Sequence, residues 1–372
     1  MTRRISLLCV IYFVVFSFLF LYVLERDVLA QTQFQLSEGS TVQHPLMAAL
    51  LPTFLFTLLG LFLGHLLGWL PLRFRAMAWC GPLLLTGLLC HWCFPMVGTS
   101  LSSYFWSGVI LIIALYLGGL LLCRNFPDSL RHLSTFSSYA WPNILLLLLF
   151  TLFSVLLANT DSVTLRTLAA SRYVRLHQYG RALHQARWER HPSYQLSAAT
   201  ALSLSETGQL GERLFAYPQP WGSEGLLPQM SDTLLVNDLP GHVALHLGYC
   251  RGSHVSATSF LATIYDMPKS RPAVRDYLLC AYLLNRDLEG FVRVLNDTCY
   301  SVDSLPRHYR EALVLRHHLR PLQAPAIDDA SLNLRFAVFQ HLLHESGTKA
   351  EREYKLRERF GANYWTYYYF PG

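Results

Sequence analysis

The sequence is poor in charged residues, and the shortage is uneven along the chain. Asp, Glu, Lys and Arg make up only 15% of the 372 residues, against roughly 25% in ordinary soluble proteins. Nearly all of the deficit lies before Ala158, and the rest of the chain has the charge density of a globular domain. We therefore expect two domains, residues 1–158 and residues 159–372.

Lysine and basic runs are also scarce. Lysine occurs only at Lys269, Lys349 and Lys355, and the net charge of +6 is carried mostly by scattered arginines. A nucleic-acid-binding surface needs basic residues clustered on one face or segment. No such run occurs, so neither DNA nor RNA is expected as a partner.

The signatures of several enzyme classes are missing as well. The sequence has no Gly-x-Ser-x-Gly nucleophile elbow, no phosphate-cradling glycine loop and no His-Glu-x-x-His zinc motif. No cofactor is therefore expected, and we favour a protein without enzymatic activity.

Long apolar segments are abundant instead. A helix needs about 20 apolar residues to cross the hydrocarbon core of a bilayer. Five segments can serve: Ile5–Leu24, Leu46–Leu70, Ala76–Val97, Phe105–Cys123 and Ala140–Ala158. The first resembles a cleavable signal, but its apolar run exceeds the roughly 7–15 residues of typical signals, so we interpret it as a retained anchor. The sequence predicts an all-α protein with five transmembrane helices in a lipid bilayer, followed by a soluble domain.

The distribution of arginine predicts the orientation. Alternate ends of the segments carry Arg3, Arg4, Arg73, Arg75, Arg124 and Arg131. The first intervening loop has only Arg26, and the third has no basic residue. Because basic loops stay in the cytoplasm, we expect a cytoplasmic N-terminus and, after five crossings, a C-terminal domain on the outside.

Small residues mark one face of the second segment. Gly60, Gly64 and Gly68 recur every four positions, so on a helix another backbone can approach closely along them. We favour packing against a neighbouring helix of the same chain. The alternative is a seam between two copies, which would make the protein a homo-oligomer.

Short amphipathic segments separated by Gly, Pro or Asn fill residues 159–372. Predicted helices cover Tyr173–His191 with a break at Gly180, Ser193–Thr207, Gln209–Phe215, Ala273–Asn285, Leu288–Leu295, Arg307–His318 and Asn333–His344. Neighbouring helices of this kind pair as hairpins, and hairpins bury their apolar faces by stacking on one another. The pattern therefore predicts a tetratricopeptide-like array. The Pro/Gly-rich segment Tyr217–Gly222 is expected to interrupt the array as an exposed loop.

Potential metal ligands recur at helical spacing at His242, His246, Cys250 and His254. Positions four apart share a helix face, and imidazole and thiolate both suit zinc. One straight helix supplies only two ligands easily, because the outer members lie about 18 Å apart. We favour packing roles and keep His242, His246 and Cys250 as weak metal candidates.

Cysteines outside the cytoplasm can pair. Cys250, Cys280 and Cys299 allow one disulfide within the second domain, and the sequence does not decide which two would join.

Two acidic residues, Glu25 and Asp27, follow the first apolar segment directly. Polytopic glycosyltransferases that use lipid-linked sugars place acidic residues in such a loop, so both are weak catalytic candidates. Charges beside a helix end are also an ordinary feature of membrane proteins.

Several segments carry a resemblance to a known family: Gly208–Phe215, Tyr217-Pro218-Gln219, Gly225-Leu226-Leu227-Pro228 and the aromatic end from Phe360 to Phe370. Together with the five apolar segments they resemble a family of uncharacterised bacterial membrane proteins. The resemblance implies a tetratricopeptide-like domain outside the cytoplasm and a place in the bacterial inner membrane, with the domain in the periplasm. It implies no catalytic residue.

The aromatic end, Tyr364–Phe370, either caps the last helices or docks onto the bilayer or a partner, because Tyr and Trp suit both roles. We favour the cap. The functional hypothesis is a membrane-anchored helical-repeat protein that binds an envelope protein or peptide. The alternative is a glycosyltransferase-like envelope enzyme acting on a lipid-linked substrate.

Overall fold

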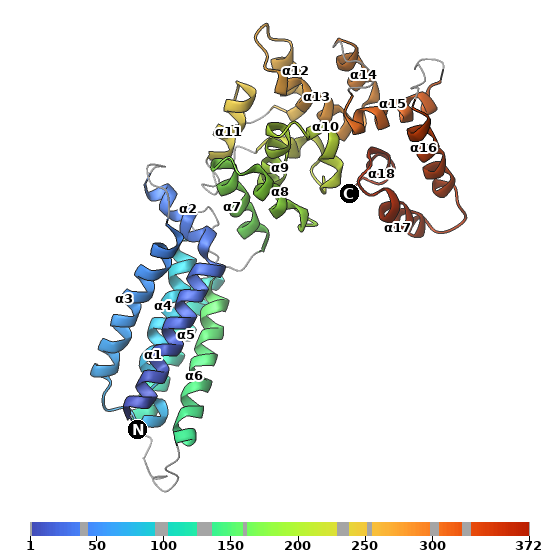
Figure 1. The fold of residues 1–372 in the computed structure, drawn as a ribbon. Coiled ribbons are helices and arrows are strands. Elements are labelled where there is room, and N and C mark those ends of the chain that lie inside the picture. Colours follow the sequence, from blue (N-terminus) through green and yellow to red (C-terminus); the bar gives the residue numbers. More distant parts are fainter. Residues whose placement is uncertain are drawn as a thin grey trace. The chain divides into compact units, whose positions relative to one another are not determined.

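The computed structural model describes residues 2–37, 44–93, 103–124, 136–158, 162–228, 238–250, 255–297, 305–321 and 329–371. These residues form helices and connecting turns and contain no strand, which confirms the predicted all-helical fold (Figure 1). They form two compact units, unit 1 within Met1–Leu165 and unit 2 within Arg166–Ser231 and Val236–Gly372.

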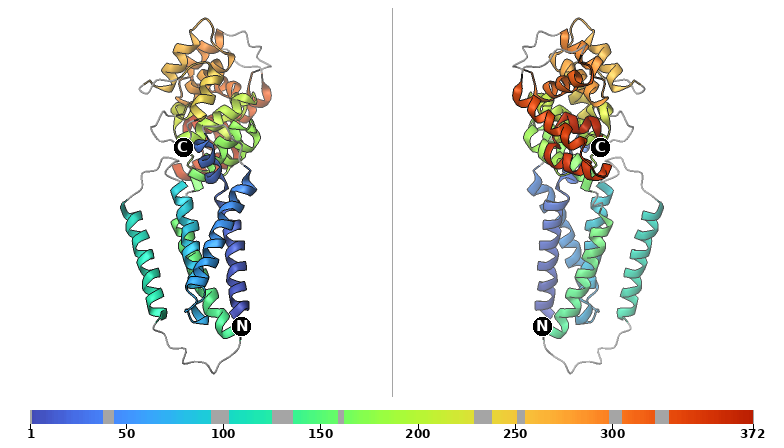
Figure 2. Two further views of the ribbon diagram at one scale, coloured as in Figure 1. Left: turned by 90° about the vertical axis from the view of Figure 1, so that its left-hand side faces the viewer. Right: turned by 90° about the vertical axis from the view of Figure 1, so that its right-hand side faces the viewer.

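Unit 1 is a bundle of long helices (Figures 1 and 2). Its elements are α1 (Thr2–Leu19), the π-helix η1 (Phe20–Leu24), α2 (Arg26–Leu36), α3 (Pro45–Leu66), the 3-10 turn η2 (Leu72–Phe74), α4 (Met77–Cys93), α5 (Ser103–Arg124) and α6 (Phe136–Leu157). Each predicted apolar segment overlaps one of the long helices α1, α3, α4, α5 and α6. The helix α4 packs against α1, α3 and α6, and it therefore forms the centre of the bundle.

The apolar surface of unit 1 suits lipid. Among the described helices, Arg3–Leu24, Pro45–Leu66 and Ser137–Leu157 are long and apolar enough to cross a membrane, and Val109–Cys123 is a shorter apolar helix. Large apolar side chains lie on the outside of α3 and α6, where Leu51 is 72% exposed and Leu156 68% exposed. Such faces are unfavourable in water and favourable in hydrocarbon. The count of five spans stays a prediction.

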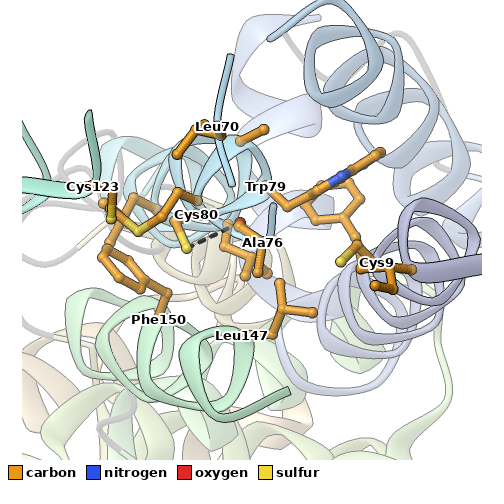
Figure 3. Packing of buried hydrophobic residues seen from close by; sticks show 14 of the residues in the cluster. Cys9, Leu70, Ala76, Trp79, Cys80, Cys123, Leu147 and Phe150 are labelled. Carbon is orange, nitrogen blue, oxygen red and sulfur yellow. Dashed lines mark hydrogen bonds between the residues drawn. The ribbon is translucent and has the colours of Figure 1, made fainter. Parts of the chain in front are cut away.

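The core of unit 1 is built around the start of α4. Trp79 and Cys80 are buried among Cys9 of α1 and Leu147 and Phe150 of α6 (Figure 3).

One polar side chain fixes the entry to α4. Asn143 of α6 accepts a hydrogen bond from the Ala76 backbone N–H at 2.7 Å and donates one to the Leu72 carbonyl at 2.9 Å. Asn143 is fully buried. A buried backbone group without a partner is costly in lipid, so this side chain satisfies the turn that leads into α4.

The three glycines of the second apolar segment have different surroundings. A Cβ atom added at Gly60 would overlap the ring of Trp79, so Gly60 lies where α3 packs on α4. Gly64 has no neighbour within 4 Å. The helix α3 ends at Leu66, so Gly68 lies in the following turn and not on the helix face where we expected it. The homodimer seam stays a prediction.

Unit 2 is a succession of shorter helices that pack as neighbours along the chain (Figure 1). They are α7 (Ser162–Arg175), which begins before the division at Leu165, α8 (Tyr179–Arg187), α9 (Tyr194–Glu206), α10 (Leu210–Arg213), η4 (Leu214–Ala216), η5 (Gly222–Leu226), α11 (Asp238–Leu247), α12 (Ala257–Tyr265), α13 (Pro272–Leu284), α14 (Leu288–Asn296), α15 (Arg307–Leu319), α16 (Ala330–Leu343), α17 (Lys349–Phe360) and α18 (Tyr364–Tyr369). Pairs such as α8–α9, α12–α13, α13–α14 and α16–α17 form the hairpins.

Local signals explain most helix boundaries. Ser193 caps α9 by accepting a hydrogen bond from the Leu196 N–H, and Gly208 (φ +66°) turns the chain after it. The predicted break at Gly180 is wrong, because Gly180 lies inside α8. The break is at His177, which takes a positive φ of 54° and lets Gln178 N–H bond back to Tyr173.

The Pro/Gly-rich segment is less exposed than predicted. Pro218 and Trp221 lie at the surface, but Tyr217 is buried. The Trp221 ring stacks on Tyr194 at 4.0 Å between centroids, and its indole N–H donates to the Pro192 carbonyl at 2.7 Å. The predicted exposed loop is therefore exposed only in part, because Trp221 packs against Tyr194 of α9 and Tyr217 is buried.

Candidate functional site

Unit 2 contains a cavity of about 370 Å³ between the Pro/Gly-rich segment and the C-terminal helices. Its lining comes from three stretches of the chain: Arg190 and His191; Phe215 to Pro220; and Arg357, Gly361, Thr366 and Tyr367. This volume lies within the range of small-ligand sites, roughly 300–1,000 Å³.

Aromatic packing forms the wall on one side. The Phe215 ring lies 4.9 Å from His308, 5.1 Å from Tyr364 and 5.0 Å from Tyr367, measured between ring centroids. Gln219 donates a hydrogen bond to the Leu214 carbonyl at 3.1 Å, which holds the loop back against η4. The loop is therefore a fixed part of the wall.

A buried carboxylate holds α18, which carries part of the aromatic wall, in place. Glu311 of α15 is fully buried and accepts hydrogen bonds from Arg307 Nε at 2.8 Å, His308 Nδ1 at 3.0 Å and the Tyr364 backbone N–H at 2.8 Å. Its backbone carbonyl accepts the Trp365 indole N–H at 2.7 Å. These bonds dock α18, and the buried Tyr364 and Trp365 confirm that the aromatic end packs as a cap.

The charged side chains that line the cavity are all basic. Arg190, His191 and Arg357 contribute basic groups, and no Asp or Glu is among the described residues that line it. Arg357 is held in place by bonds to Glu353 at 2.8 Å and to the Phe370 carbonyl at 2.9 Å. Burial raises the pKa of Tyr367, so its hydroxyl stays neutral. The cavity can hold an anionic or polar group against an aromatic wall.

The predicted metal ligands do not converge. His242 and His246 lie on α11, which ends at Leu247, while the exposed Cys250 follows a turn at Gly248 (φ +87°). His254 lies outside the described residues. Within the part of the chain that the structure describes, no group of three or more His, Cys, Asp or Glu side chains is placed to hold a metal ion.

His246 is instead part of a hydrogen-bonded cluster. Its Nε2 lies 2.8 Å from Ser205 Oγ, and its Nδ1 lies 2.9 Å from Glu206 Oε1. The His242 ring lies 6.4 Å from the ring of His177. The histidines of α11 therefore meet side chains from α9 and from the α7–α8 turn, which sequence spacing does not reveal.

The cysteines of unit 2 are unpaired where they are described. Cys250 and Cys280 are both free thiols, and Cys280 is buried 3.7 Å from the Tyr309 hydroxyl oxygen. Cys299 lies outside the described residues.

The acidic candidates Glu25 and Asp27 lie in unit 1, at the junction of η1 and α2. Glu25 is 1% exposed, and neither of its carboxylate oxygens has a hydrogen-bond partner among the described residues. Burial raises the pKa of Glu25 to about 7. Asp27 is half-buried. The two acids therefore have different surroundings.

Sequence reasoning missed the cavity as a site. Its signals were the Tyr217-Pro218-Gln219 motif and the aromatic end, both of which we interpreted as structural.

Comparison with known proteins gives one match. Two segments, residues 41–266 and 250–371, match the model of a family of unknown function (DUF6057). No curated protein and no solved structure matches the chain. Since the matched segments cover most of its length, the chain belongs to this family of unknown function.

Proposed function

We propose that the chain is a membrane-anchored helical-hairpin protein whose unit 2 lies outside the cytoplasm and binds an envelope protein or peptide. The observation that carries this proposal is the cavity of about 370 Å³ with its basic and aromatic lining.

Two further features support it. Consecutive helices of unit 2 pack as hairpins, and stacked hairpins, including tetratricopeptide-like ones, present binding surfaces in many proteins. The apolar helices of unit 1 supply the anchor. A partner segment with a carboxylate would match the basic groups, because guanidinium groups bind carboxylates through paired hydrogen bonds.

Site-specific photocrosslinking tests the binding role. The full chain would carry p-benzoylphenylalanine at Gln219, on the cavity wall, or at Trp188, which is 67% exposed and does not line the cavity. Irradiation of intact cells should give a discrete adduct from position 219 that is absent from position 188. Arg357→Glu should suppress that adduct. Identical patterns from both positions, or no adduct at 219, would overturn the proposal.

Topology needs its own measurement. Reporters active on only one side of the membrane would be fused after Arg131 and after Gly372. A cytoplasmic signal at Arg131 with an external signal at Gly372 supports the five-span arrangement. Cytoplasmic signals at both positions would place unit 2 inside the cell and remove the envelope partner.

A second candidate function is an envelope enzyme, glycosyltransferase-like, acting on a lipid-linked substrate. The burial of Glu25 without a hydrogen-bond partner among the described residues favours it, because a carboxyl kept partly protonated near neutral pH suits general acid–base work. In a strain lacking the gene, the wild-type chain should restore the profile of lipid-linked saccharides measured by mass spectrometry. Restoration by the double variant Glu25→Ala, Asp27→Ala would reject this candidate.

A further inference from the structure

The cluster around His246 has the connectivity of a catalytic relay. Ser205 and Glu206 end α9, and His246 reaches across from α11 with one ring nitrogen on each: Nε2 to Ser205 Oγ at 2.8 Å and Nδ1 to Glu206 Oε1 at 2.9 Å. A hydroxyl bonded to a base, with the base bonded to a carboxylate, is the arrangement that activates serine in unrelated folds.

The carboxylate decides the tautomer of the histidine. An ionised Glu206 can only accept, so the proton of the imidazole resides on Nδ1. Nε2 then carries the lone pair and accepts a hydrogen bond from the Ser205 hydroxyl. This is the tautomer in which His246 can act as a general base toward Ser205.

Ser205 differs from Thr200 and Ser203 of the same helix. Thr200 and Ser203 donate to the backbone carbonyls four residues earlier, at 2.7 Å each, as hydroxyls in helices commonly do. Thr207, just past the end of α9, donates to the Ser203 carbonyl at 2.9 Å. Ser205 points at His246 instead, and the residue is half-buried rather than enclosed in the core.

The surroundings favour a neutral substrate. The Tyr277 ring, fully buried, lies 6.2 Å from the His246 ring, and its hydroxyl has no hydrogen-bond partner among the described residues. The carboxylate of Glu206, whose side chain is 33% exposed, would repel an anion. Burial and then the charge of Glu206 raise the pKa of Tyr179, whose neutral hydroxyl lies 2.9 Å from His177 Nδ1.

We propose that Ser205 is a nucleophile activated by His246, with Glu206 as a positioning residue, and that unit 2 hydrolyses a neutral carboxylic ester. Ser205 Oγ attacks the carbonyl carbon while its proton passes to His246 Nε2. The bond to the alkoxy group breaks, and that group leaves as the alcohol with the proton from Nε2. Water then attacks the acyl-serine by the same route, so ester and water give acid and alcohol.

The test uses the purified full chain in detergent with a fluorophosphonate probe. Ser205 Oγ should form a bond to phosphorus with loss of fluoride and the hydroxyl proton, and mass spectrometry of the wild-type digest should find the adduct on Ser205. Ser205→Ala should abolish labelling, and His246→Gln should slow it about 100-fold or more. Thr207→Ala is the matched control and should label as the wild type does.

Two further measurements separate chemistry from packing. Glu206→Asp, which keeps a carboxylate, should retain more labelling than Glu206→Gln, whereas a purely structural role predicts no such rescue. Hydrolysis of p-nitrophenyl acetate by the full chain should fall in the same order across the variants. Absence of an adduct on Ser205 in folded wild-type protein, checked by circular dichroism, would overturn the proposal, as would labelling that survives Ser205→Ala.

Discussion

Replacing Glu311 by glutamine should loosen the C-terminal cap. Oε1 of Glu311 accepts from Arg307, and Oε2 accepts from His308 and from the Tyr364 backbone N–H. Glutamine has one carbonyl oxygen, so its NH₂ group must face donors on one of the two sides. Hydrogen bonds to charged groups contribute about 1.5–3 kcal/mol each, and breaking a buried pair costs roughly 3–5 kcal/mol. We expect a loss of about 3 kcal/mol.

Hydrogen exchange of the full chain in detergent measures the stability of the C-terminal cap locally, in the peptide that contains it. A drop of about 3 kcal/mol in the opening free energy should speed exchange in the peptide covering Tyr364 and Trp365 by about 100-fold. The matched control is Glu353→Gln, because the Glu353 side chain is 35% exposed and its partner Arg357 is 44% exposed. Exposed pairs contribute about 0–1 kcal/mol. Acceleration below threefold in Glu311→Gln, or an equal effect in the control, would refute the reasoning.

The same carboxylate predicts a pH dependence. Burial acts to raise the pKa of Glu311, but the hydrogen bond and charge of His308, the Tyr364 N–H and Arg307 outweigh it and hold the pKa below the ordinary 4.5. A group whose pKa is lowered on folding stabilises the fold above its unfolded pKa. That stabilisation is lost as pH falls below 4.5 through the folded value. After correction for intrinsic exchange, the C-terminal peptide should open more readily with acid in the wild type but not in Glu311→Gln.

Three further predictions test the packing, each by the unfolding midpoint of the full chain in detergent. Gly60→Ala should cost about 1–3 kcal/mol of stability, because the added methyl group would overlap the Trp79 ring. Its control, Gly64→Ala, has open space around it and should be neutral or slightly stabilising; equal effects of the two would contradict the packing. Asn143→Leu should cost about 1–3 kcal/mol, because two buried backbone groups lose their partner, and an unchanged midpoint would argue against that role. Ser193→Ala should cost about 1–2 kcal/mol, because it removes the helix cap and the hydrogen bond with Thr167 Oγ1 at 2.8 Å; an unchanged midpoint would argue against both roles.

The helices of this protein are largely predictable from its sequence, since their signals are local. Ser193 and Gly208 mark the ends of α9 in the residues themselves. The glycine at position 180 is a local signal that misleads. Gly180 continues a helix because the chain has already turned at His177, which tolerates a positive φ.

The candidate sites are less predictable, because their members are distant in the sequence. The cavity joins residues near 190, 219 and 357, and no period in the sequence links them. His246 was recognisable as a chemically capable residue, but its partner Ser205 lies 41 positions away. Spacing along α11 suggested ligands from one helix, whereas the structure supplies the partners from α9 and the α7–α8 turn.

Because η1 is a π-helix, the orientation of Glu25 and α2 depends on the number of residues in this turn. The Glu25 N–H bonds to the Phe20 carbonyl five residues back, so this turn holds one residue more than an α-helical turn. Each residue of an α-helix advances the side chains by about 100°. Deleting one residue between Phe20 and Leu24 would return this turn to α-helical spacing and leave Glu25 and α2 on their present side. Inserting one residue would instead rotate Glu25 and α2 by about 100°, away from the present buried position of the carboxyl group. The wide turn therefore makes the burial of this acid tolerant of a single-residue deletion and sensitive to a single-residue insertion.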